Sequence, residues 1–131
     1  MSDRARAIAE DEPFASVLGT KLDRLDTDHV EVRLPYREDL GVGRVHGGAI
    51  SALIDIAATA CFWSHPDIPD TARGATVGFT VNFLSLVVAT DLVAIATIRR
   101  RGGTLCTGDV SVRNPEGHEV ATAIVTYKLS R

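Results

Sequence analysis

The sequence is poor in cysteine and carries no excess of positive charge. Its two cysteines, Cys61 and Cys106, are too few for a disulfide framework, and both stand in apolar or strand-like surroundings. We therefore expect two buried, reduced thiols. A net charge of -3 provides no general attraction to nucleic acid or to anionic membranes, so we expect neither as a partner.

A long hydrophobic run is also missing. The apolar stretch over residues 49–63 falls short of the roughly 20 residues that a membrane-spanning helix needs, and Asp55 stands near its middle. The opening residues, "MSDRARAIAEDEPF", contain no apolar core of a secretory signal, so we expect a cytoplasmic protein. The 131 residues fit one domain, 1–131, with an N-terminal helical segment over 1–17.

Motifs for metals and nucleotides are absent as well. His65 and His118 lie in predicted turns and, together with the cysteines, show no metal-ligand spacing. The glycine pairs lack the strand-to-helix context of a phosphate-binding loop. We expect no bound metal and no separate cofactor.

One long helix dominates the remaining pattern. Residues 49–62 are apolar around nearly the whole helix circumference, which is typical of a helix buried on most sides, and residues 46–48 form its approach and first turn. Only Ser51, Asp55 and Thr59 interrupt the apolar surface. Their spacing of four places them in a single polar stripe.

About six strands accompany this helix. Residues 20–35 predict two strands around the turn "DTD", and segments near 75–83, 91–99, 104–113 and 120–129 alternate with a period of two. In the first of these segments, the alternation places Thr76 on the face opposite Phe79. Near the N-terminus, a short helical turn docks Phe14, Val17 and Leu18 on the core.

These elements predict an α+β fold with one long central helix and an antiparallel sheet. One sheet can cover only part of such a helix. A second layer is needed, and a chain of this length does not obviously supply it, which indicates a dimer.

Asp55 needs an explanation, because a carboxylate inside an apolar helix is costly without a partner. It either forms a structural hydrogen bond to a loop or a partner chain, or it acts as a general base or nucleophile in a dry cleft. The sequence pattern alone leaves both readings open.

Gly47 and Gly48 favour the second reading. A helix start presents free N–H groups and the positive end of the helix dipole, and glycine lets a ligand carbonyl approach that backbone closely. Asp55 follows Gly48 by seven residues, on roughly the same face and about 10 Å along the axis. We therefore expect the reacting group to lie between the helix start of one subunit and the acid of another.

Three segments carry a resemblance to a known family. "HGGAISALID", "TVGFTVNFLS" and "ATIRRRGGTLCTGDVSVRNPEGHEVATAIVTYKL" resemble the hotdog-fold acyl-CoA thioesterases, most closely the phenylacetate-degradation type related to 4-hydroxybenzoyl-CoA thioesterase. The resemblance spans about residues 18–129. It implies a long helix wrapped by an antiparallel sheet, a homodimer with one continuous sheet, and often a homotetramer built as a dimer of dimers.

The resemblance also implies roles for individual residues. Asp55 matches the catalytic acid, and the Gly47 amide matches the donor that polarises the thioester carbonyl. His46 and Gly48 match residues that shape the turn. Two threonines, Thr76 and Thr59, match positions that lie near the attacking water in different relatives. Further candidates are Asn82 and Phe83 for lining the coenzyme A cleft and Arg100 for binding its phosphates.

The expected function is hydrolysis of an aromatic or medium-chain acyl-CoA to a free acid and coenzyme A, which is part of the substrate. One departure from the family pattern stands at Leu40, where relatives commonly have Asn or Gln six residues before the His. This departure keeps a non-hydrolytic acyl-CoA-binding protein as the alternative. A dehydratase of the same fold is a third possibility, but "HGGAISALID" does not match a hydratase motif.

Overall fold

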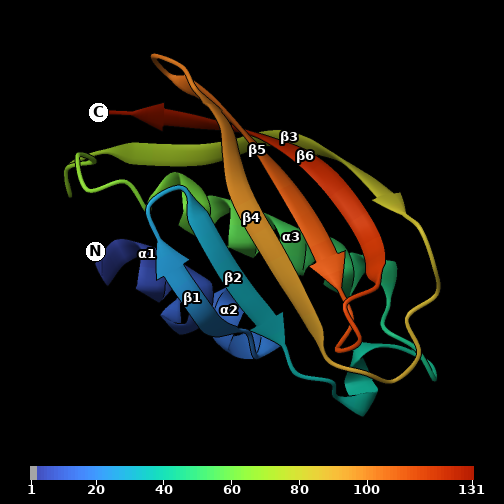
Figure 1. Ribbon diagram of the computed structural model, residues 1–131. Coiled ribbons are helices and arrows are strands. Elements are labelled where there is room, and N and C mark those ends of the chain that lie inside the picture. The colour runs from blue at the N-terminus through green and yellow to red at the C-terminus, as the bar shows by residue number, and fades with distance from the viewer. Residues whose placement is uncertain (1–2) are drawn as a thin grey trace.

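A six-stranded antiparallel sheet curves around one long helix in the computed structural model, which describes residues 3–131 (Figure 1). The strand order is β1-β2-β4-β5-β6-β3, so β1 and β3 form the edges. The strands are β1 (Lys21–Asp26), β2 (His29–Leu34), β3 (Arg73–Phe83), β4 (Leu92–Arg101), β5 (Leu105–Arg113) and β6 (Glu119–Ser130). This architecture confirms the predicted α+β fold.

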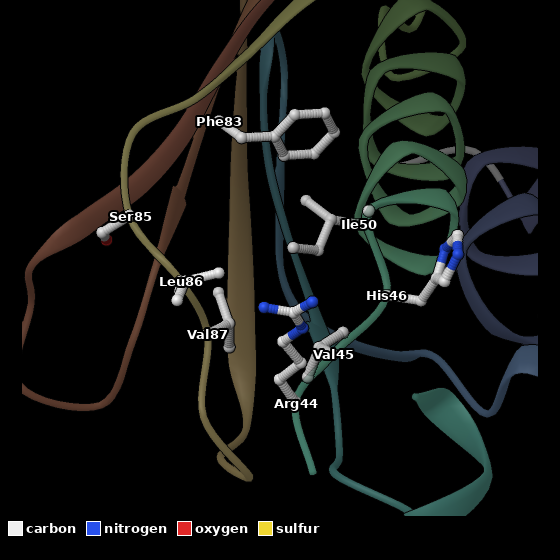
Figure 2. A pocket seen from close by; sticks show the side chains of 9 residues that line it. Arg44, Val45, His46, Ile50, Phe83, Ser85, Leu86 and Val87 are labelled. Carbon is white, nitrogen blue, oxygen red and sulfur yellow. The ribbon is translucent and has the colours of Figure 1, made fainter. Parts of the chain in front are cut away.

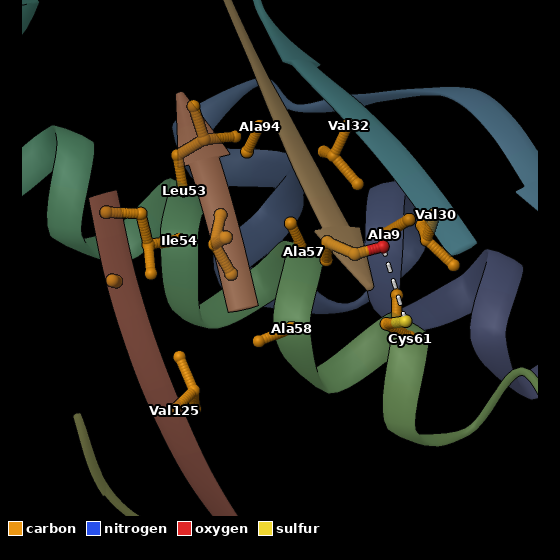
Figure 3. Packing of buried hydrophobic residues seen from close by; sticks show 14 of the residues in the cluster. Ala9, Val30, Val32, Leu53, Ile54, Ala57, Ala58, Cys61, Ala94 and Val125 are labelled. Carbon is orange, nitrogen blue, oxygen red and sulfur yellow. Dashed lines mark hydrogen bonds between the residues drawn. The ribbon is translucent and has the colours of Figure 1, made fainter. Parts of the chain in front are cut away.

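The long helix is α3 (Gly47–Phe62), which lies against the concave face of the sheet (Figure 1). Its sheet-facing side chains are fully buried, among them Leu53, Ile54 and Ala57, and they pack with Val32 and Val125 from the strands (Figure 3). The other side of the helix is only partly covered. The chain alone therefore does not supply a complete second layer.

The Arg101 side chain caps the C-terminal end of this helix. Its guanidinium donates hydrogen bonds to the last carbonyls of α3, at Phe62 O (3.0 Å) and Cys61 O (3.2 Å), and to Asp28 Oδ1 (3.0 Å). A cation at this position satisfies carbonyls that have no partner within the helix and favourably meets the negative end of its dipole. One of the three consecutive arginines is thus structural.

The N-terminal segment folds into three short pieces beside α3: α1 (Asp3–Arg6), a π-helical turn (Ala7–Asp11) and α2 (Pro13–Leu18). These pieces occupy the part of the predicted N-terminal helical segment that the structure describes, while residues 1 and 2 lie outside the described residues. The predicted docking is right for Leu18 but wrong for Phe14 and Val17, which are 59% and 71% exposed. Because α2 turns its Ala15 and Leu18 side toward the core, the neighbouring side that carries Phe14 and Val17 faces outward.

Strand β3 contains an irregularity that the period-two pattern did not predict. Its pairing with β6 shifts just after Thr76, leaving Val77 as an extra residue in a β-bulge. Thr76 stands opposite Tyr127, and Phe79 stands opposite Val125, both of which are buried on the inner face. The prediction that placed Thr76 opposite Phe79 is therefore wrong, because the extra residue reverses the alternation across the bulge. Thr76 faces α3.

Among residues 3–131, no helix has the length and apolar character needed to cross a membrane.

Candidate active site

Asp55 lies on the partly covered side of α3, where β3 reaches the helix. Its Oδ1 accepts a hydrogen bond from the Thr76 hydroxyl at 2.8 Å, in a half-buried setting. Within the described chain, the carboxylate has no other hydrogen-bond partner, so Oδ2 is available to a ligand or a water molecule. The β3 bulge makes this contact possible, since it turns Thr76 inward.

Asp55 opens onto a cavity between α3 and the N-terminal helices. The cavity has a volume of about 400 Å³ and is lined by Ile8, Glu12, Pro13, Phe14, Ala15, Asp55, Ile56 and Thr59. Its walls are mainly apolar, which suits a small acyl group. Thr59 stands one helical turn after Asp55, and its hydroxyl makes no hydrogen bond with any other residue from 3 to 131.

Several aromatic side chains pack together beside this region of the sheet. Tyr127, opposite Thr76 in the ladder, accepts a hydrogen bond from Trp63 Nε1 at 2.9 Å, and its ring stacks on Phe62 with centroids 4.9 Å apart. Burial, with a smaller contribution from the Asp55 charge, raises the pKa of Tyr127. The phenol is therefore a neutral, rigid wall. Sequence reasoning missed these aromatics, because nothing in their spacing distinguishes them from ordinary core residues.

The start of α3 provides a hydrogen-bond donor. His46 caps the helix: its Nδ1 accepts from the Gly48 N–H at 2.8 Å, and its carbonyl accepts from the next two amides. The Nδ1 atom is thus an acceptor, which places the ring proton of the neutral imidazole on Nε2. The Gly47 N–H finds no acceptor in residues 3–131 and points out of the helix start. His46 and Gly48 therefore shape the turn, and Gly47 presents the free amide.

A second cavity, of about 280 Å³, opens beside this helix start. Figure 2 shows Phe83 and Ile50 facing each other across it, with the guanidinium of Arg44 below them. A Cβ atom on Gly47 would lie 3.3 Å from Phe83 Cζ, so the ring packs closely because residue 47 is glycine. Sequence reasoning did not identify Arg44 as a candidate site residue, since the sequence shows only a cation two residues before His46. The cavity is lined by Arg44, Val45, His46, Gly47, Ile50, Phe83, Ser85, Leu86 and Val87.

The two cavities share no lining residue. Gly47 borders one and Asp55 borders the other, and eight residues of helix separate them by about 12 Å. One chain therefore does not bring the amide and the carboxylate to one cavity.

Two other candidates lie apart from these cavities. Asn82 pairs with Thr122 on the outer face of the sheet, whereas its neighbour Phe83 faces the helix start. Arg100 is exposed near the C-terminal end of α3, beside the helix-capping Arg101. Their proposed contacts with coenzyme A stay predictions.

Leu40 has a structural place in this chain. Its side chain is buried in the core, and its carbonyl accepts the His46 N–H at 2.7 Å. The residue lines neither cavity, so it contributes no polar group to either.

The described residues contain no cluster of three or more His, Cys, Asp or Glu side chains that could hold a metal ion. The buried cysteines are not exposed nucleophiles either. Burial raises the pKa of Cys61 to about 12, and its thiol donates to Ala96 O at 3.4 Å.

Comparison with known proteins agrees with this architecture. A curated protein of Halobacterium salinarum, named as a candidate esterase, is 30% identical over 137 residues that cover 96% of this chain and 90% of that protein. Two of the solved structures that share the fold illustrate the likeness. The Escherichia coli PaaI protein from the phenylacetic acid degradation operon has a TM-score of 0.82 and 22% identity, covering 95% of this chain and 88% of PaaI. A hypothetical thioesterase of Streptococcus pneumoniae, solved with coenzyme A, has a TM-score of 0.74 and 23% identity, covering 86% of each chain.

The family itself is established by sequence. The family description of the thioesterase superfamily matches residues 42–121, which include α3, its glycine start, Asp55 and most of the sheet. The chain belongs to the thioesterase superfamily.

Proposed function

We propose that this protein hydrolyses the thioester of an aromatic or medium-chain acyl-CoA, releasing a free acid and coenzyme A. One observation carries the proposal: in a chain of the thioesterase superfamily, Asp55 is fixed by Thr76 at a mainly apolar cavity and keeps one carboxylate oxygen free. The streptococcal structure with coenzyme A supports the coenzyme, and the likeness to PaaI supports the phenylacetate-degradation type.

The chemistry follows from the two polar groups. The Gly47 N–H donates to the thioester oxygen, whose negative charge grows as the carbonyl carbon becomes tetrahedral. In one route Asp55 takes a proton from a water molecule that attacks this carbon, the C–S bond breaks, and the proton on Asp55 passes to the departing coenzyme A thiolate or to solvent. In the other route Asp55 attacks the carbon, the C–S bond breaks to give an acyl-Asp55 anhydride and the coenzyme A thiolate, and water then hydrolyses the anhydride. An acylated Asp55 captured by rapid-quench mass spectrometry would establish the nucleophilic route.

A second copy of the chain completes the site in this proposal. Strand β3 is a sheet edge whose outer side has no pairing partner in the described chain, and it exposes Val77, Phe79 and Phe83. Such edges are prone to pair with another strand. An antiparallel β3–β3 pair makes one continuous sheet in a two-fold dimer and brings the helix start of one copy toward Asp55 of the other. We extend the proposal to a homotetramer of two such dimers in the cytoplasm.

An acyl-CoA panel with thiol detection tests the activity. Asp55→Asn keeps the shape of the side chain but removes its negative charge, so turnover of every cleaved acyl-CoA should fall by a factor of about 10³ or more. Asp70→Asn, in an exposed loop, is the matched control and should keep full activity. Full activity of Asp55→Asn would refute the role of Asp55. Binding of acyl-CoA without release of thiol would instead establish the non-hydrolytic alternative.

A further inference from the structure

The cavity at Asp55 is also lined by a second acidic residue, Glu12, which is exposed. Glu12 occupies the N-cap position of α2, yet its side chain makes no capping hydrogen bond. It also forms no ion pair with any other residue of the described chain. Its carboxylate therefore has no direct hydrogen-bond or ion-pair partner among residues 3–131 and is available to a ligand that enters the cavity.

No cationic side chain among residues 3–131 lines this cavity. Its other lining residues are apolar, apart from Asp55 and the hydroxyl of Thr59. Arg4 lies outside the lining, with its guanidinium 4.3 Å from the centroid of the Trp63 ring. The charges of Arg4, Asp55 and Glu12 all act on the nearby Tyr127 hydroxyl, and Arg4 opposes the two carboxylates there.

We propose that Glu12 makes the cavity selective for acyl groups without negative charge and so excludes acyl-CoA compounds whose acyl chain ends in a carboxylate. This inference rests on the proposed function, which places the acyl group beside Asp55. In the proposed binding mode, a ligand whose carbonyl reaches Asp55 extends its acyl group toward Glu12 along Ile8, Phe14 and Ile56, which line the same cavity. A terminal carboxylate would then meet the Glu12 carboxylate, and the two like charges repel, although solvent at this exposed residue weakens the repulsion.

Size and polarity agree with this selection. A cavity of about 400 Å³ is at the small end for ligand sites and suits an aryl or short aliphatic group. Its apolar walls gain free energy from burying such groups. They provide nothing that would neutralise a second negative charge.

Two non-hydrolysable thioethers separate binding from turnover: hexyl-CoA and 5-carboxypentyl-CoA, which differ only in the terminal group. Their affinities for the full-length protein are measured by titration calorimetry. The proposal requires that the wild type bind hexyl-CoA at least about threefold more tightly than the carboxylated analogue. In Glu12→Gln this ratio should fall about two- to threefold, through tighter binding of the carboxylated analogue alone.

Glu116→Gln is the matched control, because it removes one negative charge from an exposed turn far from the cavity. It should leave the ratio at the wild-type value, and thermal unfolding should show that all three proteins are equally folded. A second variant, Glu12→Lys, should lower the ratio further than Glu12→Gln does.

Each other outcome is decisive. If neither thioether binds, if both bind equally, or if Glu12→Gln leaves the ratio unchanged, the selective role of Glu12 is overturned. Cleavage of hexanoyl-CoA under those circumstances would leave the proposed hydrolase intact. Conversely, selective thioether binding without any thioester cleavage would preserve the selectivity and refute the hydrolysis.

Discussion

The Thr76 hydroxyl donates a hydrogen bond to Asp55 Oδ1 at 2.8 Å, joining the β3 edge strand to the central helix. This bond fixes the orientation of the carboxylate, while Oδ2 stays open. The contact depends on the bulge at Val77. If β3 kept its pairing with β6 from Gly78 onward but had no extra residue, the regular alternation of side chains would point Thr76 to the outer face of the sheet. The bulge is therefore part of the site.

Replacing Thr76 should lower kcat strongly and have little effect on the free energy of unfolding. Thr76→Val removes the donor but keeps the branched shape, and a lost hydrogen bond to a charged group corresponds to about 10- to 100-fold in kcat. Thr76→Ser restores a hydroxyl and should recover most of the activity. Steady-state kinetics with the best acyl-CoA of the panel provides the measurement.

Thr80→Val is the control for this pair, since Thr80 lies on the same strand and makes no side-chain hydrogen bond within residues 3–131. It should retain wild-type kcat. Equal losses in Thr76→Val and Thr80→Val would mean that the strand, rather than the hydrogen bond, matters.

The sequence predicts the parts of this site better than their arrangement. The apolar periodicity locates α3, and the acid within it identifies Asp55, since both signals come from residues close together in the chain. The bulge at Val77 has no such signal, because an extra residue in a strand becomes visible only through its pairing with β6. For the same reason, alternation misplaced Thr76, and the family pattern rather than the alternation singled it out.

The walls of the cavity were the least predictable part. Glu12 and Phe14 meet Asp55 only because the N-terminal helices fold back beside α3, a contact between residues about 40 positions apart in the chain. The sequence pattern placed Phe14 and Val17 with Leu18 on the core side of α2, whereas the core takes the side that carries Ala15 and Leu18. Arg101 shows a similar limit: a run of three arginines predicts a charged turn, whereas its last member caps the helix.

A methyl group at Gly47 should impair catalysis with little effect on stability. The added Cβ would lie 3.3 Å from Phe83 Cζ, and this ring is 52% exposed, so it can turn aside at small cost. The same methyl group would obstruct a thioester oxygen approaching the Gly47 amide, and we expect kcat/KM to fall about tenfold or more. Gly103→Ala, where a Cβ meets no atom within 4 Å, is the control and should be silent. A fully active Gly47→Ala would argue against the amide as the donor.

Substitutions of the neighbouring residues Arg101 and Arg100 should have different effects: the first should lower stability, and the second should weaken substrate binding. Arg101→Met removes the hydrogen bonds to the last carbonyls of α3 and should lower the free energy of unfolding by about 1–3 kcal/mol, measured with urea. Arg100→Met should leave stability unchanged and, if Arg100 binds a coenzyme A phosphate, raise KM with a weaker dependence on salt. An unchanged KM in Arg100→Met would remove Arg100 from the site.

The two cysteines should be unreactive toward thiol reagents in the native protein. Because burial raises the pKa of Cys61 to about 12, its reactive thiolate is scarce at pH 8, and Cys106 is buried as well. A disulfide reagent should therefore label neither thiol until the protein is unfolded.

The folded state holds the Cys61 proton more tightly than the unfolded chain, so this contribution to stability is complete below about pH 9 and is lost as the pH rises toward 12. Urea unfolding at pH 8 and pH 10.5 should show a decrease of about 1–2 kcal/mol that Cys61→Ala reduces. Rapid labelling of the native protein would contradict the burial.

Mixing two inactive variants should restore activity if each site draws on two copies of the chain. Asp55→Asn lacks the acid, and Gly47→Leu blocks the amide, whereas the two positions border separate cavities in one chain. A mixed dimer contains one site with both groups intact and one with neither. Random reassociation makes about half of the dimers mixed, so the mixture should reach about a quarter of wild-type activity per chain. Each variant refolded alone should stay inactive. A site built within a single chain predicts no recovery at all, because every chain in the mixture carries one of the two lesions.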